Sequence, residues 1–169
     1  GAAAAPPAGH GIRACGETQG GCAKARAGGL MHTPAGAAGM TEVAFHFNAP
    51  DKLAYVCRLA RKATRRDARV VITGAAQDLQ QLDRMLWALG TTDFVAHCLE
   101  DAGEEMLQLS PVVLARDACV CSHRDMLVNV GDTVPEGFAQ FARLVEVVSQ
   151  SDPADRSRAR ERWRHYAAR

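Results

Sequence analysis

The chain has 169 residues, with 20 basic and 19 acidic side chains and a formal net charge of +1. This length suits one compact domain, with or without a tail, and the near-neutral charge gives no overall attraction to nucleic acid. No apolar run approaches the length of a membrane span, so no membrane association is expected. Six cysteines are too few for a secreted disulfide scaffold of this size. We therefore expect reduced thiols in a cytoplasmic protein.

Residues 1–39 are mainly Ala, Gly and Pro and show almost no apolar periodicity. Such a segment cannot bury enough apolar surface to offset its ordering entropy. It also lacks the compact apolar stretch of a signal peptide. We expect a disordered extension, or sequence translated upstream of the native start. Met40 is the candidate initiator, because patterned sequence begins directly after it.

Four elements are expected in the next fifty residues. They are a strand over 43–47, a helix over 51–66, a strand over 69–73 and a helix over 75–89. Alternating or β-branched apolar residues predict the strands. Apolar residues at helical spacing, with basic residues mostly on the other face, predict the first helix. Gly90 ends the second.

The second half of the domain continues the pattern. We expect a short segment over 92–99, an exposed acidic turn over 101–105, buried strands over 111–115 and 126–130, and helices over 138–148 and 153–168. Strands that alternate with helices predict an α/β fold, in which one layered domain has a mostly parallel central sheet flanked by helices.

The turn after the second predicted strand superficially resembles a nucleotide-binding turn. Gly74-Ala-Ala-Gln-Asp lacks the glycines of G-x-G-x-x-G and the lysine of a phosphate-binding loop. The layers are therefore expected to be Rossmann-like without a nucleotide motif, and no cofactor is expected. The chain also lacks the G-x-S-x-G nucleophile elbow of hydrolases.

The last predicted helix carries the most specific charge pattern. Residues 153–169 contain six arginines and two acidic residues, a net charge of +4. Arg156, Arg160 and Trp163 recur at i, i+4 and i+7, so they share one face. Arginine forks beside an aromatic ring can hold a carboxylate while the ring packs against an apolar group.

Two other interpretations of this helix remain open. Its arginines could be solvated and paired with the acidic segment 100–105, because charge runs on helices are commonly exposed faces. The helix could instead bind nucleic acid directly, although the near-neutral domain weakens that reading.

A cysteine and histidine cluster offers a further alternative. His97, Cys119, Cys121 and His123 could serve a small α/β enzyme or a metal-dependent hydrolase. The spacing C-x-C-x-H differs from the C-x₂₋₄-C pairs of structural zinc sites. We therefore expect no metal and no catalytic residue.

Short stretches of this sequence resemble the chi subunit of the bacterial DNA polymerase III holoenzyme. Residues 82–87, Leu-Asp-Arg-Met-Leu-Trp, and 93–97, Asp-Phe-Val-Ala-His, resemble the LDxxLW…FVPH stretch of that family, with alanine in place of the usual proline. Residues 124–129 resemble the segment before its late strand, and residues 138–148 and 159–166 its terminal helices. The similarity runs over nearly all of 40–169, and the shared order and spacing make it specific.

The resemblance implies a non-catalytic accessory subunit in DNA replication. Such an adaptor bridges the clamp loader, through the psi subunit, to the acidic, phenylalanine-terminated tail of single-stranded DNA-binding protein, and contacts DNA only indirectly. The family's tail pocket maps onto Phe94, Arg156, Arg160 and Trp163 here, where Trp163 replaces a frequent tyrosine and Arg156 a lysine. Trp87 could serve the psi contact, whose surface the sequence does not place.

Two departures from the family pattern affect the predicted pocket. The link over 149–152 is shorter than in some relatives, so the apolar wall of the pocket is not placed. Chi proteins usually continue with a glycine and an aromatic residue where this chain stops at Arg169. We therefore expect the domain over 40–169 to be truncated at its C-terminus, with part of the pocket rim missing.

Overall fold

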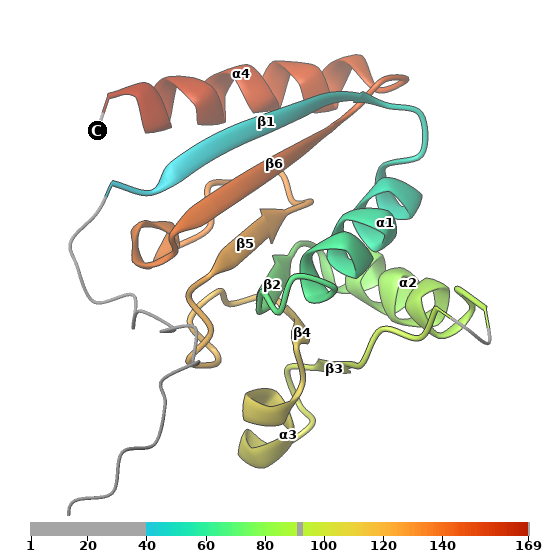
Figure 1. The fold of residues 1–169 in the computed structure, drawn as a ribbon. Coiled ribbons are helices and arrows are strands. Elements are labelled where there is room, and N and C mark those ends of the chain that lie inside the picture. The colour runs from blue at the N-terminus through green and yellow to red at the C-terminus, as the bar shows by residue number, and fades with distance from the viewer. Residues whose placement is uncertain (1–39, 91–92, 169) are drawn as a thin grey trace, which may run out of the picture. The chain divides into compact units, whose positions relative to one another are not determined.

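The computed structural model describes residues 40–90 and 93–168. The predictions for residues 1–39 and for the chain end at Arg169 lie outside these described residues. Within them, six strands form one all-parallel sheet in the order β1-β6-β5-β2-β4-β3 (Figure 1). The predicted α/β fold with a parallel central sheet flanked by helices is confirmed. No described helix has the length and apolar character needed to cross a membrane.

The elements follow the predicted order closely. The strands are β1 (Glu42–Ala49), β2 (Val70–Thr73), β3 (His97–Leu99), β4 (Val112–Ala115), β5 (Met126–Asn129) and β6 (Arg143–Ser149). The helices are α1 (Lys52–Thr64), α2 (Ala76–Trp87), α3 (Glu104–Leu109) and α4 (Pro153–Ala167), with the short 3-10 helix η1 (Phe138–Gln140). The acidic segment predicted as a turn runs into α3.

The helix predicted over 138–148 is wrong. Only the turn η1 is helical there, and the rest of the segment is β6. Both faces of β6 are buried, so apolar residues occupy neighbouring positions and mimic helical spacing. The β-branched Val145, Val147 and Val148 favour the extended state.

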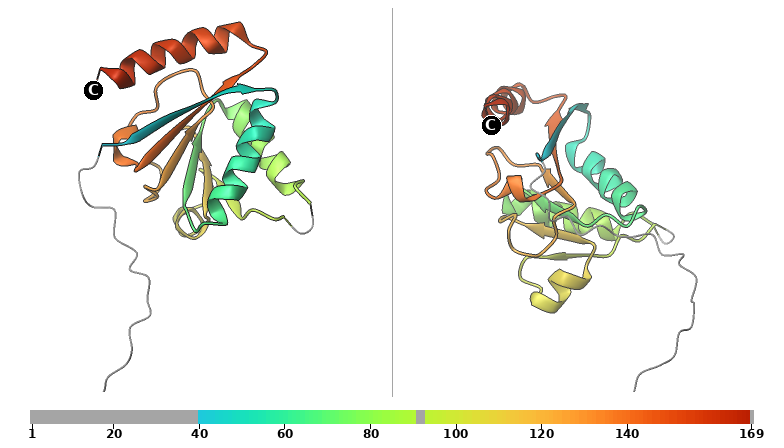
Figure 2. Two further views of the ribbon diagram at one scale, coloured as in Figure 1. Left: turned by 45° about the horizontal axis from the view of Figure 1, so that its top comes forward. Right: turned by 60° about the vertical axis from the view of Figure 1, so that its left-hand side comes forward.

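Two helical layers cover the two faces of the sheet. One core cluster joins α1 and α2 to the strand face that carries Ile72, Leu114 and Val145. The second cluster joins α3, η1 and the end of α4 to the face that carries Val71 and Leu144. In the right-hand view of Figure 2, α1 lies on one side of the sheet and α3 and α4 on the other. The outer edges of the sheet and the outward flanks of the helices are left for contacts with other molecules.

A fully buried carboxylate, Glu146 of β6, holds α4 against the sheet. Its oxygens accept hydrogen bonds from Arg162 Nε at 2.9 Å, from the Tyr166 hydroxyl at 2.5 Å and from Asn129 Nδ2 at 3.0 Å. Burial raises the pKa of Glu146, and the neighbouring Arg162 guanidinium opposes that rise. Three donors from two other elements therefore set the position of α4 over β6.

The beginning of α4 is fixed by two further carboxylates. Asp152 is the N-cap of α4, and its side chain accepts a hydrogen bond from the backbone N–H of Ala154 at 2.8 Å. Asp155 is buried and accepts from Ser149 N at 2.8 Å and from Lys52 Nζ at 3.1 Å. The helix is thus attached to the end of β6 and to α1 before it runs back along the sheet.

Replacing Arg162 by alanine leaves Glu146 buried without its cation. We expect the free energy of unfolding to fall by about 3–5 kcal/mol, as when one partner of a buried ion pair is removed. Urea denaturation followed by circular dichroism measures this. Arg164→Ala is the matched control on the exposed side of α4 and should change stability by less than about 0.5 kcal/mol. Equal losses in the two variants would contradict the role of the buried pair.

Candidate functional site

The exposed flank of α4 carries three of the four residues that were predicted to form the tail pocket. Asp155, Ala159 and Arg162 are buried against the sheet. The residues that directly follow them, Arg156, Arg160 and Trp163, are each turned about 100° further round the helix, and all three are exposed. Trp163 exposes 56% of its surface. One flank of α4 therefore presents two guanidinium groups and an indole ring to solvent.

The opposite flank of α4 is engaged within the domain. Arg158 Nε lies 2.8 Å from an Asp132 carboxylate oxygen, and the His165 ring lies 6.3 Å from the Phe138 ring of η1. Both contacts lie in the segment between β5 and β6. The flank with Arg160 must face the other way, toward the edge of the sheet where β1 is the last strand.

Two phenylalanines of β1 lie on the same face of the sheet as α4. Phe45 and Phe47 are two residues apart, so their side chains point to the same side. Their rings stack with centroids 5.6 Å apart, and the Phe45 ring lies 6.1 Å from that of Tyr166 in α4. Phe47 is 59% exposed. Together with Arg156, Arg160 and Trp163 these rings form what we call the α4–β1 strip.

The register of the sheet places Phe47 next to the middle of α4. The helix is bound to β6 at Ser149 and at Glu146, so its middle lies level with the strand between them. His46 pairs with Val147 in the sheet, which puts Phe47 at the same level. Phe47 is not among the site residues predicted from the sequence. Its only signal is an aromatic residue at an alternate position of a predicted strand.

The cations of the α4–β1 strip are available for a partner. Arg156 and Arg160 have no ion pair with any residue in the described part of the chain. The acidic segment 100–105 does not neutralise them, because Glu100 binds Arg116 Nε at 2.7 Å and no ion pair joins that segment to α4 among the described residues. The described residues therefore do not support the predicted pairing of the α4 arginines with segment 100–105, although the arginines of this flank are exposed.

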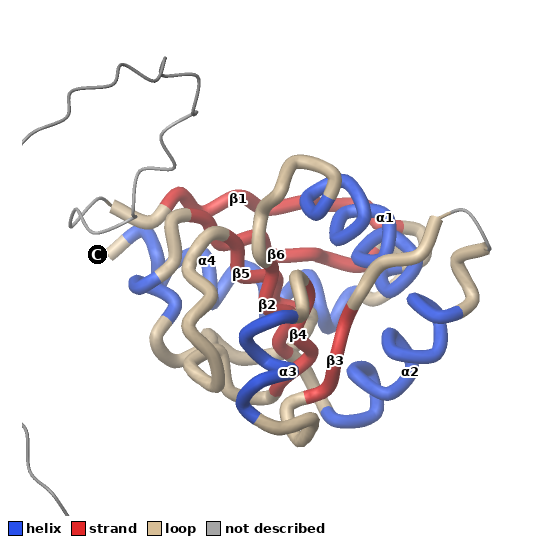
Figure 3. Tube along the Cα trace, turned by 60° about the horizontal axis from the view of Figure 1, so that its bottom comes forward, coloured by secondary structure: helices blue, strands red, loops and turns tan. Residues whose placement is uncertain are grey.

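Phe94 lies at the other end of the sheet. It precedes β3, which is the edge strand opposite β1. Its ring packs against that of Trp87, the last residue of α2, with centroids 5.4 Å apart. Figure 3 shows α2 and β3 well away from α4. The structure thus brings Arg156, Arg160 and Trp163 together and leaves Phe94 on a separate surface.

Ion pairs hold this second surface in place. Asp93 binds Arg61 of α1 at 2.9 Å and Arg65 at 2.8 Å, which fixes the chain directly before Phe94. Trp87 and Phe94 nevertheless expose 63% and 59% of their surfaces. Two adjacent exposed aromatic rings on a fixed backbone are typical of a protein contact rather than of a core. We call them the aromatic pair.

The cysteine and histidine cluster is not assembled as a metal site. His97 Nδ1 forms a hydrogen bond with the Val95 carbonyl, and His123 Nε2 forms one with the Ser110 carbonyl, both at 2.7 Å. Burial lowers the pKa of His123 and raises the pKa of the Cys121 thiol. Among the described residues no three His, Cys, Asp or Glu side chains are placed to hold a metal ion. These contacts do not support the metal-dependent enzyme as an alternative.

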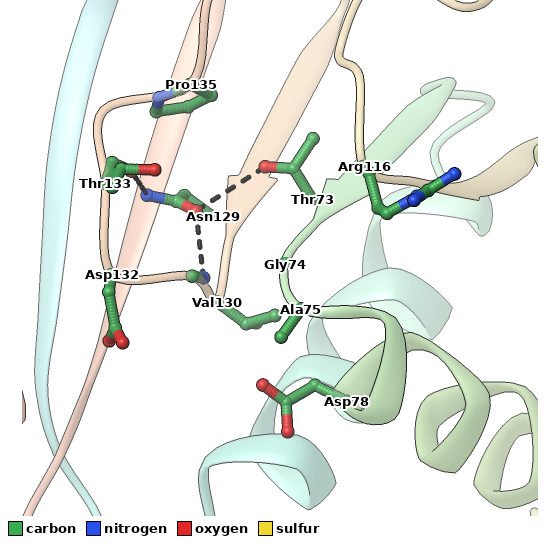
Figure 4. Close-up of a pocket in the computed structure, with 11 residues that line it drawn as sticks. Thr73, Gly74, Ala75, Asp78, Arg116, Asn129, Val130, Asp132, Thr133 and Pro135 are labelled. Carbon is green, nitrogen blue, oxygen red and sulfur yellow. Dashed lines mark hydrogen bonds between the residues drawn. The ribbon is translucent and has the colours of Figure 1, made fainter.

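A cavity of about 370 Å³ opens at the carboxyl ends of β2 and β5 (Figure 4). Open α/β sheets commonly bind ligands at such a position, where neighbouring strands continue in opposite directions. Here the side chain of Asn129 forms hydrogen bonds within the protein. Its Nδ2 donates to the Thr133 carbonyl and its Oδ1 accepts from the backbone N–H of Gly131, both at 2.9 Å. Asp78 and Asp132 line opposite walls, and their charges would repel a phosphate. Arg116 also lines the cavity, but its Nε binds a Glu100 carboxylate oxygen at 2.7 Å, so this lining does not favour a nucleotide.

The family is shown by comparison with known proteins. The model of the family described as DNA polymerase III chi subunit, HolC, matches residues 40–169. The chain belongs to the DNA polymerase III chi subunit family. The DNA polymerase III subunit chi of Pseudomonas aeruginosa is 33% identical over 116 residues, which cover 68% of this chain and 78% of that protein. The resemblance in the sequence is confirmed, and this chi-family chain is a DNA polymerase III subunit that serves DNA replication.

The separation of Phe94 from α4 can be tested without any ligand. In a Trp163→Phe variant, Trp87 is the only tryptophan, and under excitation selective for tryptophan Phe94→Ala should change its fluorescence spectrum because the two rings are in contact. In a Trp87→Phe variant, Trp163 is the only tryptophan, and the same Phe94→Ala change should leave its spectrum unaltered. A clear spectral change of Trp163 would place Phe94 beside α4 and contradict the two-surface arrangement.

Proposed function

We propose that this chi-family chain is a non-catalytic cytoplasmic adaptor. It would bridge the clamp loader, through the psi subunit, to the C-terminal tail of single-stranded DNA-binding protein, with only indirect contact to DNA. The observation that carries the proposal is the pair of exposed aromatic surfaces at opposite edges of one sheet, of which the α4–β1 strip also presents Arg156 and Arg160, two exposed arginines without an ion pair to another described residue. Two surfaces of different chemistry suit two different partners.

The α4–β1 strip suits an acidic tail that ends in phenylalanine. Arg160, with Arg156 one turn away, binds the terminal carboxylate through charge-assisted hydrogen bonds. Trp163 packs against the terminal phenyl ring, and Phe47 takes the role that the sequence analysis assigned to Phe94. Capture of a C-terminal carboxylate beside an apolar pocket is a recurrent mode of peptide recognition.

The aromatic pair suits a partner that buries apolar side chains. Trp87 and Phe94 offer two adjacent exposed aromatic rings, next to a backbone that Asp93 holds through ion pairs with Arg61 and Arg65. Aromatic residues of this kind commonly contribute most of the binding free energy of an interface. We assign this surface to psi. Because the two surfaces lie at opposite sheet edges, both partners can bind at once.

Arg160→Ala should weaken binding of a short acidic peptide ending in Pro-Phe by on the order of 1.5–3 kcal/mol, the contribution of a charged hydrogen bond. Isothermal titration calorimetry with the full chain measures the affinity. Arg164→Ala removes the same charge from the outward side of α4 and should change the affinity far less. Peptide binding by Arg160→Ala as tight as that of the unmodified chain would overturn the site.

Phe94→Ala and Phe47→Ala should have opposite consequences in two binding assays. Phe94→Ala should weaken binding of psi by about 2 kcal/mol or more, as expected of an interface hot spot, and leave tail-peptide binding unchanged. Phe47→Ala should weaken the tail peptide and spare psi. If Phe94→Ala weakened the tail peptide instead, the single pocket expected from the sequence would be correct and the two-surface proposal would fail.

A further inference from the structure

A cavity of about 170 Å³ lies beneath the second half of α1, at the amino-terminal ends of β5 and β6. We call it the α1 pocket. Its floor includes the apolar side chains of Leu59, Met126 and Val145. It lies on the face of the sheet that α1 and α2 cover, whereas the α4–β1 strip lies on the other face. It is therefore separate from the tail site.

The rim of the α1 pocket is basic. Lys62 and Arg66 of α1 and its following turn are exposed, and neither has an ion pair with another described residue. Arg143 reaches the rim from β6, and none of the nine lining residues is acidic. The nearest carboxylate to Arg143 belongs to Glu42, at 3.6 Å and largely exposed. The buried Nε atom of Arg143 has no hydrogen-bond acceptor in the described part of the chain.

These cations also act on His46, which lines the α1 pocket. His46 Nδ1 lies 2.7 Å from the Tyr55 hydroxyl. Burial lowers the pKa of His46, and the charges of Arg143 and Lys62 lower it further. Basic residues in the last turn of α1 would complement the helix dipole without any ligand. The dipole of α1 does not account for Arg143, because Arg143 belongs to β6 and lines the same α1 pocket.

The size and floor of the α1 pocket limit what it can bind. Pockets that enclose whole small molecules have volumes of roughly 300–1,000 Å³, so this one has room for a single side chain. The apolar floor offers no hydrogen bond or ion pair to the phosphate groups of a nucleic acid. We propose that the α1 pocket binds a short acidic segment of a partner protein. One branched aliphatic side chain enters the cavity, and the flanking carboxylates bind Lys62, Arg66 and Arg143.

The test uses the ¹⁵N-labelled full chain and the peptide acetyl-Asp-Asp-Leu-Asp-Asp-amide. The amide end removes the terminal carboxylate that the α4–β1 strip would capture. NMR titration should shift the amide signals of Leu59, Lys62 and Val145. Replacing the central leucine of the peptide by serine should weaken binding about tenfold, because burial of a leucine side chain contributes at least the ~1.4 kcal/mol of a tenfold change.

Charge reversals on α1 separate a defined pocket from general attraction. Arg66→Glu should abolish the shifts, whereas Arg58→Glu, an equal charge change on an exposed α1 residue outside the lining, should reduce affinity no more than about threefold at physiological salt. Arg160→Ala should leave the titration unchanged, so this inference can fail or succeed independently of the proposed tail site. Circular dichroism confirms that each variant folds.

Three results would overturn the α1 pocket assignment. One is the absence of shifts at these residues with the acidic peptide. Another is equal loss of binding in the Arg66→Glu and Arg58→Glu variants, which would indicate charge attraction alone. The third is a matching set of shifts with an oligothymidylate and none with the peptide, which would make the rim a nucleic-acid contact.

Discussion

The contact between Glu146 and Arg162 is the interaction on which the proposed tail site depends. It joins the middle of α4 to the middle of β6 through charged groups that are both buried. A buried ion pair adds little net stability compared with an apolar pair, because desolvation offsets its attraction. Its directional geometry, however, sets the rotation of α4 about its own axis. With Arg162 turned to the sheet, Arg160 and Trp163 necessarily point along the flank above β1.

The placement of both proposed surfaces follows from the architecture of a parallel sheet. Helices bury its two faces, so only the edge strands and the outward flanks of helices remain accessible. The α4–β1 strip occupies one edge and the aromatic pair the other. In the proposed function, this small domain would hold its two partners apart without a second domain. The α1 pocket, at the amino-terminal ends of β5 and β6, would add a third contact of different charge and shape.

The differences between the predicted and the observed structure have physical causes. The segment 138–148 was predicted as a helix because β6 is buried on both faces, and a continuous apolar run contains helical spacings by chance. Phe94 was grouped with Arg160 through the family resemblance, whereas Phe94 precedes β3, the edge strand at one end of the sheet, and α4 packs on β6 near the other end. Phe47 was not predicted as a site residue because an aromatic residue in a strand is as typical of a core as of an exposed edge.

The sequence by itself determined the parallel α/β class, the order of nearly all elements, the family, and the cationic flank of α4. These properties are local, since they depend on periodicity within one segment and on short motifs. The tertiary structure alone decided which aromatic residue lies beside that flank, and which arginines are neutralised by distant carboxylates. It also decided that Lys62, Arg66 and Arg143 surround one apolar hollow. Strand order brings residues from distant segments together, and no local pattern encodes that order.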